Sequence, residues 1–507
     1  MRIGHCSGGL GRIKTLPTLL QGELERVLPG KRQPPDVLVG WGRKPSWARA
    51  RAYAIRHERP LWTLEDGFYR SLGLGVSGSP AHSLIVDRQG IYFDATAPNE
   101  LETMLRDDPV GPELRDRAES LMARVRATRI SKYNTAPDHP LPANDGRPRV
   151  LVVDQTLNDA SVHYGMGDPE AFDCMLIAAR AEHPDAEILV RTHPDVVAGR
   201  KRGYLLEAAR KARCTLLSQP RSPWAVLDAV TDVYTVTSQL GFEALLAGCE
   251  VHCFGMPFYA GWGLTNDRQA HPRRGVVRDL ATLFAHAVIR YPRYINPYTG
   301  ERCEPEAAIE RLAEQYRQQE TTRGAWLGVG LSRRKRRFVP QFLGAGAHVH
   351  CVPAGAEAAT NNRNAERIAW GEAARALPGP VSRVEDGFLR SVGLGVDMVD
   401  PVSVVIDHRG IYYDPQDPSD LEVLLATTPF TDALRARARG LRERIVAGRL
   451  SKYNVGASTT LRIPANRRVV VVPGQVETDA SIQCGTGAIG SNQRLLEAAR
   501  AAEPDAW

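Results

Sequence analysis

The sequence lacks the long apolar runs and the dense cysteine spacing that mark membrane proteins and disulfide scaffolds. Its 507 residues contain no run of about 18 consecutive apolar residues, so no helix is expected to span a bilayer. The first residues carry positive charge but lack the apolar run of roughly 7–15 residues that a signal peptide requires. The eight cysteines are scattered, as is typical of reduced thiols. We therefore expect a cytoplasmic protein with at most peripheral membrane contact.

Motifs for metal ions and nucleic acids are equally scarce. Cys249, His252 and Cys253 lie close together, but their segment alternates like a short strand, so no metal site is expected there. An Asp-x-Asp motif, which holds a divalent ion against a diphosphate sugar, does not occur. The net charge of +7 suits acidic partners, yet zinc-finger and RNP patterns are missing. The sequence predicts neither a metal nor another cofactor, and no nucleic-acid binding.

A long internal repeat dominates what the sequence does contain. The twelve residues Glu65–Val76 recur as Glu385–Val396, 320 residues later, with ten identical positions. A period this long exceeds that of solenoid repeats and indicates duplication of a whole module. Further blocks repeat at the same offset, namely Asp87–Asp94, Ser131–Asn134, Gln155 and Asp159–Ser161.

Each module alternates strand-like apolar runs with helix-like segments. In the first module, Arg149–Val153 is expected to form a strand, Glu170–His183 a helix and Glu187–Val190 the next strand. This βαβ rhythm is typical of parallel sheets covered by helices, and it occurs twice per module. The predicted fold class is α/β, with two Rossmann-like halves facing a cleft in each tandem module. Ligands of such folds bind at the carboxyl ends of the strands.

The repeat also predicts the domain boundaries. A stretch rich in Pro, Asn and Gly at 137–148 separates the halves of the first module. Glu503–Trp507 aligns with His183–Glu187, so the second copy is expected to be incomplete. The expected division is a first half at 1–136, a second half at 148–319, the first half of module two at 325–465 and a truncated start of its second half at 466–507.

Adjacent carboxylates follow the strand-like segment Leu61–Leu64. Glu65 and Asp66 would stand at a strand end facing the cleft, where two neighbouring acids can differ in pKa and act as base or acid. Their copies in module two are Glu385 and Asp386. The alternative is a glycine-containing turn with solvated acids.

A second block follows the strand that ends at Val153. Asp154 is not kept in the repeat, which leaves Gln155 and Asp159 as the candidates. Asp159 is the stronger carboxylate for chemistry, although an N-cap of the following helix would also favour aspartate there. The copies in module two are Gln475 and Asp479.

The strand Glu187–Val190 is followed by a candidate phosphate-binding turn. Arg191, His193 and Pro194 lie there, and an imidazole held by a proline turn can donate a hydrogen bond to a phosphate.

A third strand end, in the same half, precedes a helix start. Ser238 and Gln239 would stand at the helix N-terminus, where backbone amides bind phosphate, and Glu243 one turn later can accept hydrogen bonds from ribose hydroxyls. Plain capping by Ser238 is the alternative. We expect a nucleotide-bearing ligand in this half.

Five motifs carry a resemblance that extends over essentially the whole chain. They are Glu65-Asp-Gly, Gln155–Asp159, His193-Pro194, Ser238–Leu245 and Phe258–Leu264. Together with the tandem duplication, they resemble the capsule polysaccharide β-Kdo transferases called KpsC.

The resemblance implies GT-B-like modules that take the acidic sugar Kdo from CMP-β-Kdo. Such modules extend a β-Kdo chain on a lyso-phosphatidylglycerol acceptor with retained configuration, making 2,4 linkages in the first module and 2,7 linkages in the second. The implied partners are CMP-Kdo, the lipid-linked Kdo acceptor and capsule assembly proteins at the cytoplasmic face of the inner membrane. The implied function is synthesis of the linker in capsule polysaccharide biosynthesis and transport.

Residue roles follow from the same resemblance. Asp159 would be the nucleophile, and Glu65 or Asp66 would assist proton transfer with the acceptor hydroxyl. Arg70 and Lys132 would pair with Kdo carboxylates, with solvated basic side chains as the alternative. The implied donor-binding residues are Gln155, Arg191, His193, Pro194, Ser238, Gln239 and Glu243.

Two other functions stay open on the sequence alone. A sugar-nucleotide epimerase also uses two Rossmann-like halves, and fold does not fix function. A non-catalytic partner in capsule assembly or export would bind CMP without transferring sugar. Counterparts of the donor-binding motifs would fall beyond residue 507, so this sequence is expected to make one type of linkage. Its tail from about Arg467, with a strand begun at Arg468–Val472, is expected to be loosely packed.

Overall fold

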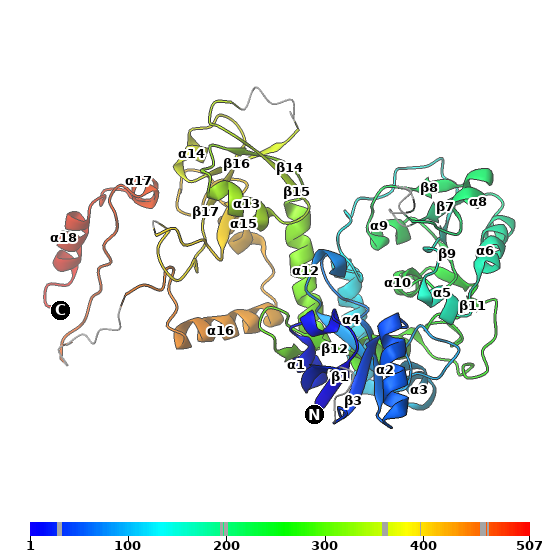
Figure 1. The fold of residues 1–507 in the computed structure, drawn as a ribbon. Helices are drawn as coiled ribbons and strands as arrows, with labels where there is room; N and C mark the ends of the chain where they lie inside the picture. The colour runs from blue at the N-terminus through cyan, green and yellow to red at the C-terminus, as the bar shows by residue number, and fades with distance from the viewer. Residues whose placement is uncertain are drawn as a thin grey trace. The chain divides into compact units, whose positions relative to one another are not determined.

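The computed structural model describes residues 1–27, 33–192, 196, 201–356, 364–395, 397–456, 463 and 466–507. They form two compact units, unit 1 at Met1–Glu320 and unit 2 at Thr321–Trp507 (Figure 1).

The first half of unit 1 is built on a mixed sheet of seven strands, counted over the described residues. The strand order is β13-β12-β5-β4-β3-β1-β2, in which β2, β1, β3 and β4 run parallel and β5, β12 and β13 are antiparallel to their neighbours. The strands are β1 Arg2–His5, β2 Glu23–Arg26, β3 Val37–Trp41, β4 Leu61–Asp66, β5 Ser83–Asp87, β12 Pro292–Ile295 and β13 Arg302–Cys303. The helices are η1 Leu10–Arg12, α1 Leu16–Leu20, α2 Pro45–Arg56, η2 Gly75–Ser77, α3 Glu100–Asp107, α4 Pro112–Thr128, α11 Leu280–Phe284, η3 Ala285–Arg290 and α12 Pro305–Thr321.

The second half of unit 1 has a fully parallel sheet with the order β11-β10-β9-β6-β7-β8 in its described residues. Helices cover the sheet, so its central strands are continuous apolar runs, as the buried Val150–Val153 shows. Asp168 caps α6 through a hydrogen bond from the Ala171 N–H, with Pro169 at the first helical position. The strands are β6 Arg149–Val153, β7 Glu187–Arg191, β8 Thr215–Leu217, β9 Asp232–Thr235, β10 Glu250–Cys253 and β11 Asn266–Asp267. The helices are α5 Ala160–Tyr164, α6 Pro169–Glu182, α8 Leu206–Lys211, α9 Pro223–Leu227 and α10 Leu240–Ala247.

The chain returns to the first half after it has formed the second half. β12 lies within 148–319, the range predicted for the second half, yet it pairs antiparallel with β5 of the first sheet. Ile295 at the end of β12 is fully buried in the core of the first half, which explains the pairing. The predicted boundary is corrected accordingly, because the second half ends before β12.

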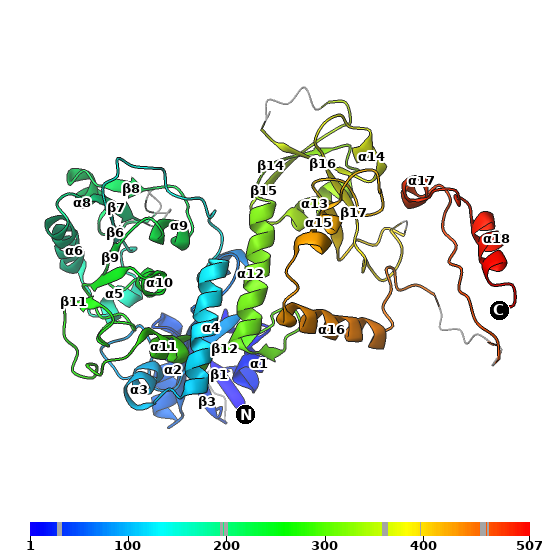
Figure 2. The same cartoon turned by 180° about the vertical axis from the view of Figure 1, so that it is seen from behind.

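One continuous apolar core joins the two halves of unit 1. Phe68 of the first half packs against Phe258 of the second half, with ring centroids 4.6 Å apart, and both side chains are buried. α4 and α12 run side by side in both views (Figures 1 and 2), and the Arg117–Glu306 ion pair of 2.6 Å joins them. The returning segment therefore closes the first half against its own helix α4.

Unit 2 repeats the design of the first half of unit 1. Its described sheet has the order β15-β14-β16-β17-β18, with only β18 antiparallel to its neighbour. Glu385 pairs with Val405 in the same register in which Glu65 pairs with Ile85. The strands are β14 Gly324–Val329, β15 Ala347–Val352, β16 Glu366–Trp370, β17 Ser382–Asp386 and β18 Val404–Asp407. The helices are α13 Lys335–Leu343, α14 Glu372–Arg375, α15 Asp420–Thr427, α16 Asp432–Ala447, α17 Ala480–Gly485 and α18 Asn492–Ala502.

The last segment of unit 2 is largely exposed. Arg468–Val472, predicted as the start of a sheet, forms no strand among the described residues, and Val471 is 82% exposed. In unit 1 the corresponding strand β6 is paired on both sides, with β7 and with β9. The described residues 466–507 contain no strand that could pair with Arg468–Val472 in the same way. One backbone contact of unit 1 is nevertheless kept. The Trp507 N–H donates to the Arg468 carbonyl, just as the Glu187 N–H donates to the Pro148 carbonyl in unit 1.

Within the described residues, no helix combines the length and apolar character needed to cross a membrane.

A close backbone approach fixes the turn that follows β4. A Cβ added at Gly67 would lie 2.1 Å from the Ser83 Oγ and 2.6 Å from the Ser83 Cβ, and this hydroxyl already donates to the Tyr69 carbonyl. Gly387 meets Ser403 in the same way, at 2.1 Å. Only glycine fits these two positions without displacement of the neighbouring strand.

Gly67→Ala is therefore expected to lower the free energy of unfolding of unit 1 by about 1–3 kcal/mol, the usual cost of overpacking. Thermal and urea unfolding of the full chain measure this loss. Gly8→Ala is the control, since no atom lies within 4 Å of its added Cβ. Equal midpoints for the two variants would contradict the expectation.

Candidate active site

A cavity of about 780 Å³ lies between the two halves of unit 1. The first half contributes the turn after β3, the end of β4 and the segment around Lys132, and the second half contributes the carboxyl ends of β6, β7 and β9. This is where open parallel sheets bind their ligands. The lining includes the predicted residues Glu65, Lys132, Gln155, Asp159, Arg191, Ser238, Gln239 and Glu243.

Glu65 points to the cavity while its neighbour Asp66 is engaged behind it. The Glu65 Oε1 accepts hydrogen bonds from the Trp41 Nε1, at 3.0 Å, and from the Asp66 N–H, at 3.1 Å. Burial raises the pKa of the Glu65 carboxyl, and the charge of Lys132 opposes that shift. A carboxyl with a raised pKa is suited to exchange a proton near neutral pH.

Asp66 forms a brace with Arg70. The Arg70 Nε lies 2.6 Å from the Asp66 Oδ1, and the Tyr133 hydroxyl donates to the Asp66 Oδ2 at 3.2 Å. The Arg70 Nη1 donates to the Ser71 Oγ and the Ser79 carbonyl. Neither Asp66 nor Arg70 is among the residues lining the described cavity. Of the two predicted pairs, Glu65 with Asp66 and Lys132 with Arg70, only the first-named residue of each lines it.

Asp159 lies at the cavity and caps α5. Its Oδ1 accepts hydrogen bonds from the N–H and the Oγ of Ser161, both at 2.9 Å, and its side chain is half-buried. Gln155 fastens the same loop, since its Oε1 accepts from the Thr237 N–H at 3.0 Å and its Nε2 donates to the Ser161 Oγ at 3.2 Å. The Asp159 Oδ2 is not used in these bonds. The capping that the sequence offered as the alternative is therefore present, and it leaves one oxygen of a positioned carboxylate for chemistry.

Asp154, which the second copy of the repeat does not keep, is buried and holds neighbouring segments together. Its carboxylate accepts hydrogen bonds from the Thr192 Oγ1, at 2.8 Å, and from the Tyr204 N–H, at 2.9 Å. Burial raises the pKa of its carboxyl, and these hydrogen bonds oppose that shift. It ties the end of β6 to the segment after β7.

Arg191 and Glu243 are charged residues that line the cavity on the side of the second half. The Arg191 Nη2 donates to the Arg221 carbonyl at 3.0 Å, and its Nη1 is buried without a partner among the described residues. Burial lowers the pKa of Arg191, and Glu243 opposes this. Burial raises the pKa of Glu243 to about 7, and Arg191 followed by Lys132 oppose it. A ligand phosphate would supply the acceptor atom that the Arg191 Nη1 lacks among the described residues.

Ser238 and Gln239 stand at the start of α10. The Ser238 Oγ accepts a hydrogen bond from the Leu240 N–H at 3.3 Å, but the N-cap of α10 is Gln239, which makes no side-chain capping bond. The Gln239 Nε2 donates to the Phe68 carbonyl of the first half at 3.0 Å, and its Oε1 is buried without a partner in the described part of the chain. Gln239 therefore links the halves and keeps an acceptor atom at the cavity.

His193 and Pro194, the remaining predicted donor-binding residues, lie outside the described residues. Their neighbour Thr192 lines the cavity.

The copies in unit 2 keep the local contacts of these residues. Asp386 pairs with Arg390 at 2.8 Å, and burial raises the pKa of the Glu385 carboxyl. Asp479 caps α17 through the Ser481 N–H at 2.9 Å. Gln475 and Asp479 lie in the largely exposed last segment, where Gln475 is itself exposed.

Sequence reasoning missed several polar residues that line the cavity. Arg43 and Lys44 follow Gly42 at the end of β3, and Tyr92, Thr192 and Thr237 line the same space. A Gly-Arg-Lys-Pro turn directly after a strand was the available signal, because polar residues at strand ends face the cleft of this fold.

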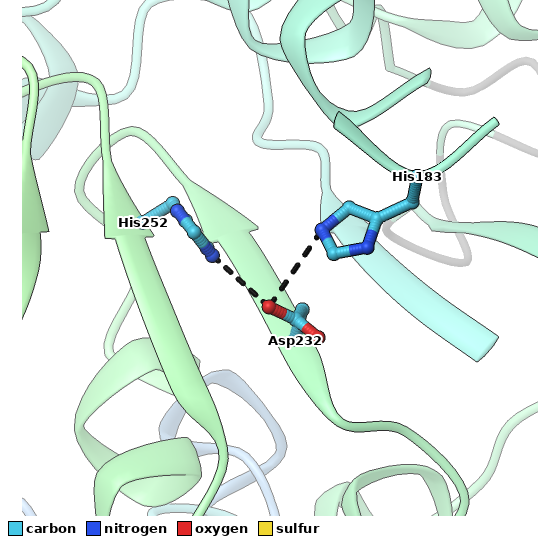
Figure 3. Close-up of side chains that lie close together, drawn as sticks. All are labelled: His183, Asp232 and His252. Atoms are coloured by element: carbon cyan, nitrogen blue, oxygen red, sulfur yellow. Dashed lines mark hydrogen bonds and ion pairs between the residues drawn. The ribbon is translucent and has the colours of Figure 1, made fainter. Parts of the chain in front are cut away.

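Two imidazoles and a carboxylate lie close together in the second half of unit 1 (Figure 3). The Nε2 atoms of His252 and His183 lie 3.1 Å and 3.7 Å from the same Asp232 Oδ1. The Tyr234 ring stacks on His252 with centroids 4.2 Å apart. The three ligand-type atoms lie within 4.8 Å of one another, a geometry that could hold a metal ion, but none of these residues lines the described cavity.

Two Rossmann-like halves around a cavity with carboxylates at strand ends form a GT-B-like architecture. The family model described as capsule polysaccharide biosynthesis protein matches residues 36–294, 358–454 and 430–507. The chain belongs to this family. The match to both units agrees with the predicted tandem duplication.

Three relatives support this assignment. The capsule polysaccharide modification protein LipA of Neisseria meningitidis serogroup B is 39% identical over 524 residues, which cover 99% of this chain and 74% of LipA. The lipopolysaccharide-processing protein LpsZ of Rhizobium meliloti is 43% identical over 284 residues, covering 55% of this chain and 64% of LpsZ. The solved KpsC β-Kdo 2,4 transferase of Thermosulfurimonas dismutans is 42% identical with a TM-score of 0.59, covering 62% of this chain and 98% of that one. The predicted KpsC type and the role in capsule polysaccharide biosynthesis are confirmed.

The raised pKa of Glu243 predicts a pH-dependent stability. Its pKa of about 7 in the folded chain lies above its ordinary value of 4.5, so the native protein loses stability as pH rises from about 4.5 through 7. Glu243→Gln has no carboxyl at this position, so its stability should not fall with pH for this reason. Relative to the native chain, the variant is expected to gain up to about 3 kcal/mol of unfolding free energy between pH 4.5 and pH 8, at about 1.4 kcal/mol per pKa unit.

Urea unfolding of both proteins across this pH range measures the difference. Glu250→Gln, at an exposed position of β10, is the control and should follow the native profile. A constant difference between Glu243→Gln and the native chain at every pH would contradict the raised pKa.

Proposed function

We propose that unit 1 transfers Kdo from CMP-β-Kdo to a Kdo-terminated, lipid-linked acceptor with retention of configuration. The observation that carries the proposal is the single cavity that brings Asp159 and Glu65 together from the two halves, beside Arg191 and Glu243. The similar Thermosulfurimonas dismutans protein is a β-Kdo 2,4 transferase, which supports the same donor sugar and linkage here.

The proposed reaction uses two displacements at the anomeric carbon. In the first, an Asp159 carboxylate oxygen bonds to that carbon as the bond to the CMP phosphate oxygen breaks and CMP leaves with the electron pair. In the second, the acceptor hydroxyl oxygen attacks the same carbon, the bond to Asp159 breaks, and Glu65 takes the hydroxyl proton. Two inversions restore the original configuration, as in retaining glycosidases. The capping bonds from Ser161 hold Asp159 in place without using its Oδ2.

The donor would bind against the second half. The Arg191 Nη1, which has no partner among the described residues, would bind the phosphate together with the backbone amides at the start of α10, while Glu243 would accept from ribose hydroxyls. Gln155 supports this side through the end of β9, and the Gln239 Oε1 offers a hydrogen-bond acceptor. His193 and Pro194 complete the proposed donor set from the sequence.

The acceptor would bind against the first half, beside Glu65 and Lys132. Because it carries a lipid, the proposal includes peripheral contact with the cytoplasmic face of the membrane and with other capsule assembly proteins. Arg70 enters as the residue that orients Asp66, since its guanidinium is occupied by that carboxylate.

Asp159→Ala is expected to lower transfer at least about 1,000-fold while CMP binding stays within about threefold, because the attacking oxygen is lost and the phosphate-binding groups stay. Product formation from in situ CMP-Kdo and a synthetic Kdo acceptor, together with calorimetric CMP titration, measure both quantities.

The matched control is Asp168→Ala, which removes an N-cap of the same half away from the cavity. It should keep its transfer rate. Near-native product from Asp159→Ala would refute the nucleophile, and equal losses in both variants would attribute the effect to capping. Sugar consumption without acceptor would instead favour an epimerase, and CMP binding without transfer in the native chain would favour a non-catalytic assembly partner.

Transfer is expected to persist in excess EDTA. In the proposed site Arg191, Lys132 and a helix N-terminus supply the positive charge that a divalent ion supplies in other glycosyltransferases. Initial rates with and without chelator should agree within about twofold. Loss of turnover that magnesium restores would contradict the proposal.

A further inference from the structure

Arg43 is a buried cation at the wall of the cavity with one nitrogen unpaired. Its side chain is 8% exposed, and its Nε and Nη2 donate to the Asp94 Oδ2 at 3.0 Å and 2.5 Å. Its Nη1 is buried and has no hydrogen-bond partner among the described residues. Buried polar groups are nearly always paired, so an unpaired guanidinium nitrogen on a residue that lines a ligand cavity indicates a place for an acceptor atom of the ligand.

The Arg43 guanidinium is held rigidly. It lies 4.3 Å from the centre of the Trp47 ring and 5.6 Å from that of Tyr164, which belongs to the second half. Its partner Asp94 is fixed in turn by hydrogen bonds from the N–H and the hydroxyl of Thr96, at 3.0 Å and 2.6 Å. Because Asp94 occupies Nε and Nη2, the free Nη1 is presented in one orientation, which suits specific recognition of an anion.

The surroundings of Arg43 favour an anionic group on the acceptor side. Lys44 and Lys132 line the same cavity and add positive charge. A Cβ on the preceding Gly42 would lie 2.9 Å from the Glu65 Oε2. The backbone next to Arg43 is therefore close to Glu65, the proposed proton acceptor. The anion bound by Arg43 would therefore belong to the sugar whose hydroxyl reacts.

Unit 2 has the same turn, but there Asp414, the copy of Asp94, pairs with Arg383 of β17 at 3.5 Å. Gly42 and Gly371 both follow a strand-ending tryptophan, both have positive φ, of 50° and 57°, and both donate their N–H to the next strand, at 2.8 Å and 3.0 Å. The residue that follows is Arg43 in unit 1 and Glu372 in unit 2. A position that changes charge between two copies of one turn is suited to distinguish their acceptors.

We propose that the Arg43 Nη1 binds the carboxylate of the terminal acid sugar of the acceptor and makes unit 1 specific for it. This inference rests on the proposed function, because Kdo supplies the carboxylate. Arg43 is then a substrate-binding residue, with Asp94 positioning it.

The test compares two acceptors that differ in one group. One is a synthetic Kdo-terminated acceptor, and the other carries a carboxamide in place of its terminal carboxylate. With in situ CMP-Kdo, the native full-length chain is expected to prefer the carboxylate acceptor about ten- to hundredfold in kcat/KM, the range of a charge-assisted hydrogen bond. In Arg43→Gln this ratio should fall close to one, while the KM for CMP-Kdo stays unchanged. Arg43→Lys should give an intermediate ratio.

Two further variants separate binding from folding. Arg51→Gln removes the same charge from an exposed position of α2 outside the cavity and should keep the native ratio. Because Arg43→Gln leaves Asp94 without its cation, the double variant Arg43→Gln/Asp94→Asn removes both charges. It should recover the melting temperature of the native chain but not the acceptor preference.

An unchanged ratio in Arg43→Gln overturns the inference, and so does a raised KM for CMP-Kdo with the acceptor preference intact. Failure of the proposed function looks different, since the native chain then forms no product from either acceptor. Calorimetric titration of the two acceptors decides in that case. Tighter binding of the carboxylate acceptor by the native chain, lost in Arg43→Gln, supports the Arg43 site, and equal binding of both acceptors by the native chain refutes it.

Discussion

The ion pair between Asp66 and Arg70 fixes the loop on which the first half's side of the cavity depends. The Lys132 carbonyl accepts the N–H groups of Arg70 and Ser71, so the pair also positions the segment that carries the Lys132 side chain. Unit 2 forms the same contacts with Asp386 and Arg390. Ion pairs of low exposure contribute more to a defined geometry than to net stability, which is the role required here. The brace consumes one acid of the Glu-Asp pair and leaves the other, Glu65, for the cavity.

Charge inside the cavity is distributed between the halves. The first half supplies Glu65 with Lys132 and Arg43, and the second half supplies Asp159 with Arg191 and Glu243. Burial raises the pKa of both glutamates and lowers that of Arg191, so each of these groups is more easily neutral than it would be in water. For the proposed donor, an anionic sugar linked to a phosphate, this distribution would place cations on both sides of the reacting carbon and carboxylates beside it.

The sequence predicted what depends on neighbouring residues and missed what depends on distant ones. Capping by Asp159 follows from Ser161 two residues later, and Asp479 caps α17 in the same way although the strand before it does not form. The return of β12 to the first sheet could not be predicted, because only three residues of this strand pair with a strand about 200 positions earlier.

Arg43 shows the same limit within the site. A basic pair after glycine is usually a solvated turn, and its burial here depends on Asp94 and on Tyr164 of the other half. The roles proposed for the carboxylates came from the family resemblance that motifs at strand ends carry. In Arg43 and Arg191, the buried guanidinium nitrogens that lack a partner among the described residues are visible only once the chain is folded.

The late arrival of β12 also sets an order of assembly during synthesis. The second half of unit 1 is one continuous stretch, so it can complete its parallel sheet as soon as β11 at Asn266–Asp267 has left the ribosome. The first half, although it is translated earlier, must wait for Pro292–Ile295 to cover β5 and for α12 to pack on α4. Domains usually fold from the N-terminus onward as the chain emerges. In this protein the half that is made second can be finished first, and the half that is made first stays open along one edge until then.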